Sequence, residues 1–345
     1  MRERSFAMVR HGVWILLVVL TSVSWGGDAA RKGTTGADQL LIPVGARSIA
    51  TGGAFLATAQ GVEAIYYNPA GLAASYKSEA MFSYMSYIAD INVAYFATAV
   101  YVEELGTFAL SYKTLDFGDI PITTFENPDG TGSTYSPGFF TLGLSYARAI
   151  TDRVTAGTTV KLVQESIMST SATGVAVDFG VQYKFQRNLA LGVTIKNVGS
   201  NMKYTGADLL TRTNVPGTAS NSPTGVYSPD TEAFQIPSYF ELSASYTAEL
   251  DNMNSLMLGT TFRNNNALED QVMLGLEYQL FKTLSLRGGY ERATENAESA
   301  IYGFNFGAGV EYAMESGLQM SVDYAFRTVK EFPSDNHIFT LKIGF

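Results

Sequence analysis

Residues able to do covalent chemistry are few in this sequence of 345 residues. Cysteine is absent, which excludes thiol nucleophiles, disulfide bonds and thiolate metal sites. One of the two histidines, His11, lies in the N-terminal leader. For the other, His337, the sequence shows no arrangement of serine and acidic residues that would require a catalytic triad. No acidic loop has the spacing of an EF-hand calcium site. We therefore expect no catalytic residue, no metal site and no cofactor.

Charged residues are sparse and mostly acidic. They make up 16% of the sequence, with 23 basic and 32 acidic residues and a net charge of −9, against about 25% charged residues in an average soluble protein. A negative surface repels phosphate backbones, so nucleic acid is not an expected partner. The 20 tyrosines and 33 glycines add to a composition typical of a β-rich protein that is partly solvated by something other than water.

The first 26 residues have the features of a secretory signal peptide. Three arginines within the first ten residues precede an apolar core at 13–20, and small residues at 22–26 offer a cleavage site. The alternative is a membrane anchor, but the apolar core is shorter than the roughly 20 residues that span a bilayer. No other stretch is long enough for a membrane helix, and we expect none in the mature chain.

From about residue 78 to the end, apolar and polar residues alternate with a period of two. In residues 173–185, Val175 and Phe179 fall on an apolar face, and Asp178 and Gln182 fall on the other. This alternation predicts strands with one apolar and one polar face. The fourteen expected strands cover residues 78–88, 91–103, 106–115, 138–149, 153–165, 173–185, 189–199, 236–250, 254–264, 269–281, 283–293, 301–313, 317–328 and 336–345.

Alternating strands fit a soluble sandwich as well as a barrel in lipid, and the lengths of the connections separate the two. Connections after even-numbered strands are short, whereas the long ones, 116–137 and 200–235, follow odd-numbered strands. Outer-membrane barrels sort their loops in this way, and tyrosines near strand ends suit their aromatic girdles. We therefore predict an all-β fold, a 14-stranded antiparallel transmembrane β-barrel in the bacterial outer membrane, with both termini in the periplasm.

Residues 27–77, between the signal peptide and the barrel (78–345), do not alternate. They are apolar and rich in glycine, and Asn68-Pro69 has the residue types that begin a helix. The Gly52-Gly53 pair lacks the Lys-Ser/Thr pair of a phosphate-binding loop. We expect these residues to form a plug-like hatch inside the barrel.

The charged residues that alternation places toward the lumen carry both signs. Such a mixture is more typical of a salt-bridged wall that holds a plug than of an apolar tunnel. These residues are Asp178, Lys184, Glu277, Arg287, Glu291, Asp323 and Arg327.

Three runs stand out in the hatch segment: Gly45-Ala46-Arg47, Gly52-Gly53-Ala54-Phe55, and residues 64–73 with the sequence AIYYNPAGLA. Together they resemble the N-terminal signature of the PorV/PorQ family of outer-membrane barrels, which are related to FadL-type transporters of hydrophobic compounds. The resemblance covers about residues 39–73, and Thr51 and Tyr67 depart from the family pattern. The matching residues, which we take as candidate hatch residues, are Gly45, Ala46, Arg47, Gly52, Gly53, Asn68, Pro69, Ala70 and Gly71.

The resemblance implies a non-enzymatic role in type IX protein secretion, with exported cargo proteins and a cell-surface attachment complex as partners. Aromatic side chains on the two long loops would then be the contact surface. The alternative is a FadL-like passive channel for small hydrophobic compounds. The candidate loop residues are Phe117, Phe125, Tyr135, Tyr227 and Phe234.

The last strand ends on an aromatic residue, Phe345, at the carboxyl terminus. A terminal phenylalanine that closes an amphipathic strand resembles the signal by which outer-membrane barrels are recognised for assembly. Membrane lipid and the barrel-assembly machinery are therefore expected partners.

Overall fold

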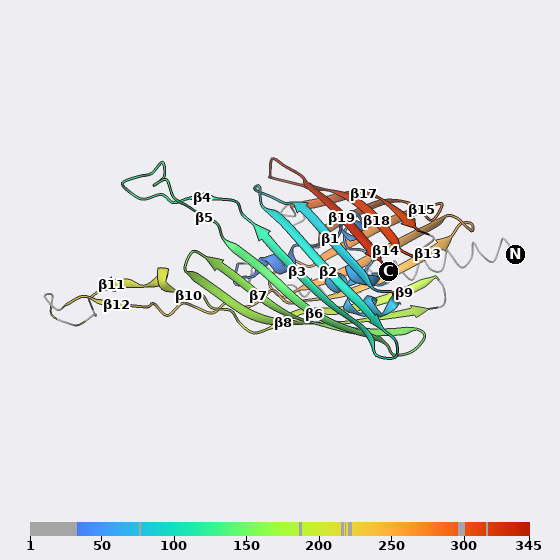
Figure 1. The fold of residues 1–345 in the computed structure, drawn as a ribbon, viewed down its shortest axis with the longest axis horizontal. Coiled ribbons are helices and arrows are strands. Elements are labelled where there is room, and N and C mark those ends of the chain that lie inside the picture. The colour runs from blue at the N-terminus through green and yellow to red at the C-terminus, as the bar shows by residue number, and fades with distance from the viewer. Residues whose placement is uncertain are drawn as a thin grey trace.

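The computed structural model describes residues 33–75, 77–185, 188–214, 217, 219, 223–295, 301–314 and 317–345; the expected signal peptide lies outside them. The main sheet has 15 strands, of which one, β10, has two residues, and the remaining fourteen form a closed antiparallel barrel (Figure 1). The barrel closes because β1 pairs with β19 and β8 pairs with β9. Its strands are β1 (Glu79–Ser86), β2 (Asn92–Val102), β3 (Gly106–Asp116), β6 (Gly138–Ala149), β7 (Val154–Ile167), β8 (Thr170–Phe185), β9 (Leu189–Gly199), β13 (Tyr239–Glu249), β14 (Ser255–Asn265), β15 (Gln271–Leu280), β16 (Leu284–Ala293), β17 (Tyr302–Ala313), β18 (Gln319–Val329) and β19 (Asn336–Gly344).

The predicted 14-stranded barrel is therefore confirmed, and each strand lies within three residues of its expected bounds. The two long connections extend from the same end of the barrel, beyond the strands (Figure 1). They contain short elements of their own: β4 (Ile120–Pro121), β5 (Thr134–Tyr135), β10 (Thr205–Gly206), η5 (Ala207–Leu209), β11 (Thr211–Thr213) and β12 (Gly225–Tyr227).

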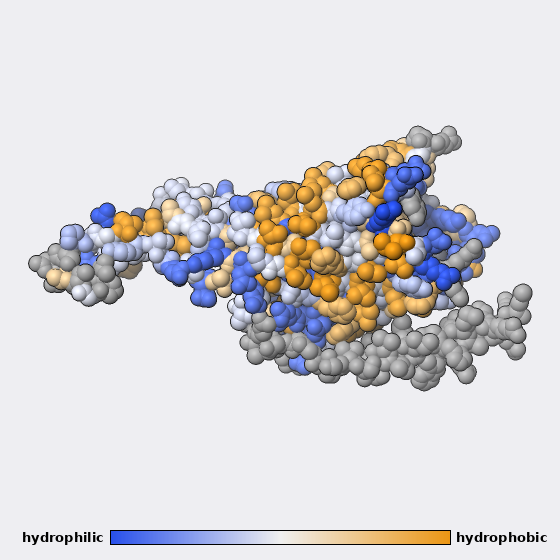
Figure 2. Space-filling model, turned by 90° about the horizontal axis from the view of Figure 1, so that it is seen from below, coloured by the Kyte–Doolittle hydropathy of each residue, from blue (hydrophilic) through white to orange (hydrophobic). Residues whose placement is uncertain are grey.

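The barrel is apolar outside and polar inside, the reverse of a soluble protein. On β8, Phe179 and Val181 are exposed, whereas Asp178 and Gln182 are buried. Apolar residues cover the barrel body, and hydrophilic ones gather toward its ends (Figure 2). An apolar belt on the outer face of a closed barrel is the surface that contacts lipid. This pattern excludes the soluble sandwich.

Residues 33–75, which we call the luminal segment, lie inside the barrel. Their apolar side chains pack in three clusters against inward-facing residues of the strands. Close approach depends on glycines in the wall: a Cβ on Gly157 would lie 2.5 Å from the backbone of Pro69, and one on Gly289 would lie 2.3 Å from that of Thr51. The segment contains η2 (Asp38–Leu41), α2 (Ala46–Ala50), η3 (Gly61–Glu63), α3 (Ala64–Tyr67) and η4 (Pro69–Ala74).

A β-bulge interrupts the pairing of β8 with β9. The register shifts between Val177 and Phe179, so that Asp178 faces two residues of β9, Lys196 and Asn197. Asn197 adopts a φ of 57°, a left-handed conformation that asparagine tolerates. Its backbone N–H donates to Asp178 Oδ1 at 2.8 Å, and both bulge side chains are buried in the lumen.

Within the described residues, the helices are too short and insufficiently apolar to cross a membrane.

Candidate functional site: the barrel lumen

Asn68 connects the luminal segment to the barrel wall. Its side-chain oxygen accepts a hydrogen bond from the N–H of Ala70 at 3.2 Å and so caps η4, with Pro69 in the first turn. Its Nδ2 donates to the carbonyl oxygen of Val181 on β8 at 3.2 Å. The expected helix start is thus present, as a 3-10 helix, and the same side chain fixes its position against the wall.

A chain of four charged residues joins α2 to three strands. The Nε and Nη2 atoms of Arg47 each lie 2.9 Å from a carboxylate oxygen of Glu277 on β15. Glu277 also pairs with Arg287 on β16 at 2.5 Å, and Arg287 pairs with Asp323 on β18 at 2.6 Å. Positive and negative charges alternate along this series of four residues, so each buried ion has a partner of opposite charge.

Three further candidate hatch residues make close contacts, two of them within the luminal segment and one with the barrel wall. Gly45 has a φ of 83°, and a Cβ there would lie 2.4 Å from Glu63 Oε1. A Cβ on Gly71 would lie 2.0 Å from the carbonyl oxygen of Ala59. The backbone N–H of Ala46 donates to Thr340 Oγ1 at 2.9 Å. The remaining members of the set lie in the same segment, with Ala70 buried and positive φ at Gly52 and Gly53.

The luminal charges expected from alternation are confirmed as inward-facing, except that Lys184 is only half-buried. Arg327 pairs with Glu291 at 2.7 Å. Its guanidinium also lies 3.3 Å from the ring centre of Tyr302. Opposite charges joined between neighbouring strands (β15 with β16) and across one intervening strand (β16 with β18) form the salt-bridged wall that the sequence predicts.

A second group of luminal charges lies on β3, β7, β8, β9, β13 and β14, and of these the sequence interpretation names only Asp178. Lys161 pairs with Asp178 at 2.5 Å, and Arg263 pairs with Glu241 at 2.8 Å. Lys196 is 1% exposed and its Nζ has no hydrogen-bond partner among the described residues. Alternation alone could have found Lys161, since it falls between two outward-facing apolar residues.

Tyrosine rings surround these lysines. The Nζ of Lys196 lies 4.3 Å from the ring centre of Tyr66 and 5.2 Å from that of Tyr239, which suits cation–π contacts. The hydroxyls of Tyr66 and Tyr67 donate to the carbonyl oxygens of Leu40 and Val44 at 3.1 and 2.9 Å. Burial raises the pKa of both phenols, so they remain neutral donors.

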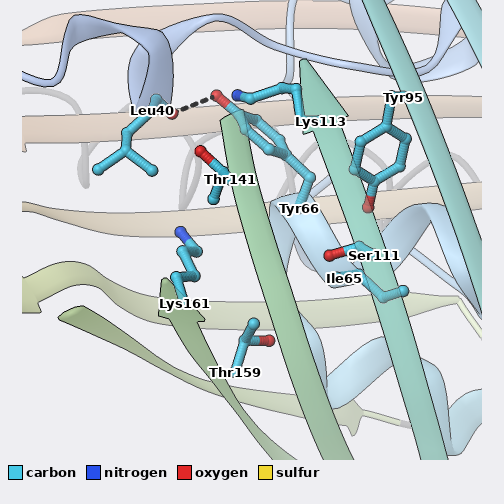
Figure 3. A pocket seen from close by; sticks show the side chains of 9 residues that line it. All are labelled: Leu40, Ile65, Tyr66, Tyr95, Ser111, Lys113, Thr141, Thr159 and Lys161. Atoms are coloured by element: carbon cyan, nitrogen blue, oxygen red, sulfur yellow. Dashed lines mark hydrogen bonds between the residues drawn. The ribbon is translucent and has the colours of Figure 1, made fainter. Parts of the chain in front are cut away.

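A cavity of about 30 Å³ lies between the luminal segment and this wall. Figure 3 shows the side chains of Lys113, Thr141 and Lys161 converging on it from β3, β6 and β7, with Tyr66 on the side of the luminal segment. The other residues that line it are Leu40, Ile65, Tyr95, Ser111 and Thr159.

The loop aromatics divide into two groups. Phe117 packs on Phe139 with ring centres 4.9 Å apart, and Phe234 packs on Tyr204 at 5.4 Å, so these two fold back onto the barrel rim. Tyr135 is half-buried in β5, whereas Phe125 and Tyr227 are exposed. Only the last two remain available as contact residues on the loops.

At the carboxyl terminus, the Phe345 ring is exposed while its backbone N–H donates to the carbonyl oxygen of Ser78 at 2.9 Å. His337, the second residue of β19, lies on the outside of the barrel and shares a hydrogen bond of 2.8 Å with the Tyr324 hydroxyl. In the part of the chain that the structure describes, no three His, Cys, Asp or Glu side chains are grouped to hold a metal ion.

No protein-family model matches the sequence, and no curated protein of similar sequence is found. Solved structures do match. A FadL homologue of Pseudomonas aeruginosa superposes with a TM-score of 0.56 at 14% identity, covering 88% of this chain and 98% of that one. The toluene transporter TodX of Pseudomonas putida gives 0.55 at 12% identity, covering 88% and 96%. The toluene transporter TbuX of Ralstonia pickettii gives 0.51 at 14% identity, covering 88% and 97%. At these identities the likeness shows a shared fold.

Proposed function

We propose that the chain is a passive channel that admits small hydrophobic compounds across the bacterial outer membrane. The observation that carries the proposal is the match of the whole barrel to that of the P. putida toluene transporter, over 88% of this chain and 96% of that one. The apolar outer face of the barrel supports a membrane location. The PorV/PorQ resemblance of residues 39–73 remains a prediction, with FadL-type barrels as the broader group.

Passage of an aromatic hydrocarbon through the described cavities at the luminal segment requires the segment to move. Two cavities that border it among the described residues have volumes of about 30 and 10 Å³, room for water-sized molecules. An aromatic hydrocarbon does not fit in either. Several of the contacts that hold the segment are polar, such as those of Arg47 and Asn68, and water can replace them when the segment shifts.

A reversible crosslink between the luminal segment and β14 tests the proposal. Thr58 Oγ1 lies 3.4 Å from Met257 Sδ on β14, and the chain has no cysteine to interfere. Cells that carry Thr58→Cys/Met257→Cys in the outer membrane should take up radiolabelled toluene after reduction, and should lose this uptake when a short bis-methanethiosulfonate reagent bridges the two thiols. The single Thr58→Cys variant is the control, and the reagent should not change its uptake.

Two results would count against this channel. Uptake by reduced cells no greater than that of cells without the barrel would contradict a channel for this class of compound. Equal uptake by the bridged and reduced double variant would contradict movement of the segment near Thr58.

Type IX secretion, which the PorV/PorQ resemblance implies, is the second candidate, and its contact residues would be the exposed Phe125 and Tyr227 on the loops that extend beyond the barrel (Figure 1). Affinity purification from native outer membranes should then recover secreted proteins that share a C-terminal sorting domain. The double variant Phe125→Ser/Tyr227→Ser should no longer recover these secreted proteins. The variant Phe117→Ser, changed at the barrel rim, should recover more of them than the double variant does. Recovery of the barrel alone would contradict this role.

A further inference from the structure

The cavity beneath the luminal segment is built from two rows of cross-strand neighbours. Tyr95, Lys113 and Thr141 are paired directly across β2, β3 and β6. In the next inward-facing row, Ser111 faces Gly143, which in turn faces Lys161. Gly143 has no side chain, and the Ser111 hydroxyl lies over it, since a Cβ there would be 2.6 Å from Ser111 Oγ. The cavity lies between these rows and the luminal segment.

Among the groups that face the cavity, hydrogen-bond donors outnumber acceptors. Lys113 has three N–H donors, one of which binds the carbonyl oxygen of Ile42 at 2.9 Å. The Lys161 ammonium donates to Asn197 Oδ1 at 2.8 Å and pairs with Asp178, which leaves it one further donor. The hydroxyl of Thr141 is buried and has no partner among the described residues.

Positive charge also exceeds negative charge around the cavity. Asp178 is the acidic partner of Lys161, whereas no ion pair joins Lys113 or Lys196 to an acid among the described residues. Both lysines lie within 5.0 Å of the ring centre of Tyr66, which supports a cation but brings no charge. A buried ammonium is stable when an opposite charge accompanies it. In this wall, the cavity beside Lys113 is the place where such a charge can lie.

We propose that the cavity binds a small inorganic anion of the chloride class, held by the ammonium groups of Lys113 and Lys161 and by the hydroxyl of Thr141. A cavity of about 30 Å³ has room for a small inorganic ion. The anion joins β3, β6 and β7 to the luminal segment through Lys113, which also binds Ile42. This role is independent of what the barrel transports.

Halide dependence of stability tests the site. The purified, folded protein in detergent is melted in sodium chloride and in sodium gluconate at equal ionic strength, and the melting temperature should be higher in chloride. Crystals grown with bromide should show an anomalous bromine peak in contact with Lys113 Nζ and Thr141 Oγ1.

Variants assign the effect to this cavity. Lys113→Met should lose the difference between chloride and gluconate, and Thr141→Val, which keeps the side-chain shape, should reduce it. Lys203→Met is the control, because Lys203 is an exposed lysine paired with Asp230 on a loop, and it should keep the difference. Equal melting in the two salts without a bromine peak would mean that the cavity holds water only. That result, or a full chloride effect in Lys113→Met, would overturn the proposal.

Discussion

The guanidinium of Arg47 forms two hydrogen bonds of 2.9 Å with the carboxylate of Glu277, which lies 230 positions later in the chain. One partner belongs to the luminal segment and the other to the barrel wall. Glu277 in turn binds Arg287, so a single carboxylate compensates two arginines. This residue therefore joins the luminal segment to the ion-pair network of the wall.

Glu277→Gln should destabilise the folded barrel by about 3 kcal/mol, because removing one partner of a buried pair leaves charges uncompensated. Arg47→Gln should cost less, about 1 kcal/mol, since the Arg47 side chain is 31% exposed and Glu277 keeps Arg287. Urea unfolding followed by far-ultraviolet circular dichroism measures both. Equal losses in the two variants would contradict the central role of Glu277.

Gly71→Ala should destabilise the protein by about 1–3 kcal/mol, since the added methyl group would collide with the backbone of Ala59. Gly288→Ala is the matched control, because a Cβ there would have no neighbour within 4 Å. The urea midpoint of the heat-modifiable folded band measures both variants. A wild-type midpoint in Gly71→Ala would show that the luminal segment packs more loosely than its contacts indicate.

Deletion of Phe345 should lower the amount of folded barrel in the outer membrane, because it removes the terminal ring and the backbone hydrogen bonds with Ser78. Phe345→Ala keeps the backbone bonds and removes only the ring. If the exposed ring is the assembly signal, both variants should give less heat-modifiable protein in isolated membranes. Normal levels in Phe345→Ala would show that the ring is not required.

Asp251, in the short turn between β13 and β14, should contribute to stability in a pH-dependent way. Hydrogen bonds from the Asn254 side chain and from the backbone N–H of Met253 and Asn254 lower the pKa of Asp251 in the folded protein. A folded-state pKa below the unfolded value of about 3.9 stabilises the protein above that pH, and the stabilisation is lost as the pH falls through the folded pKa. Asp251→Asn should therefore melt lower than wild type at neutral pH, and the difference should shrink below about pH 4. A difference that stays constant into strong acid would contradict this assignment.

The sequence predicts the wall of the barrel well because alternation is a local property. A strand side chain points to one face or the other according to its parity, so Phe179 outside and Asp178 inside follow from the order of residues alone. The Asn68-Pro69 helix start is equally local, since the cap is formed within two residues. The contact of Asn68 with Val181 is not local, and no spacing in the sequence indicates it.

The loop aromatics show where sequence reasoning stops. Phe117 and Phe125 lie on one loop and have the same side chain, yet one packs on Phe139 and the other is exposed. Packing depends on which surface the folded loop meets, and that surface is formed by residues distant in the chain.

The sequence by itself determined the strands, their apolar face, the fourteen-stranded closure and the sorting of long and short loops, because each depends on periodicity and spacing along the chain. The tertiary structure decided which luminal residues meet. The bulge turns Asn197 inward, against the alternation and next to the inward-facing Lys196, so that its side chain meets Lys161. Charges from distant strands can compensate one another only once the register is fixed, and the register results from closing the barrel around the luminal segment.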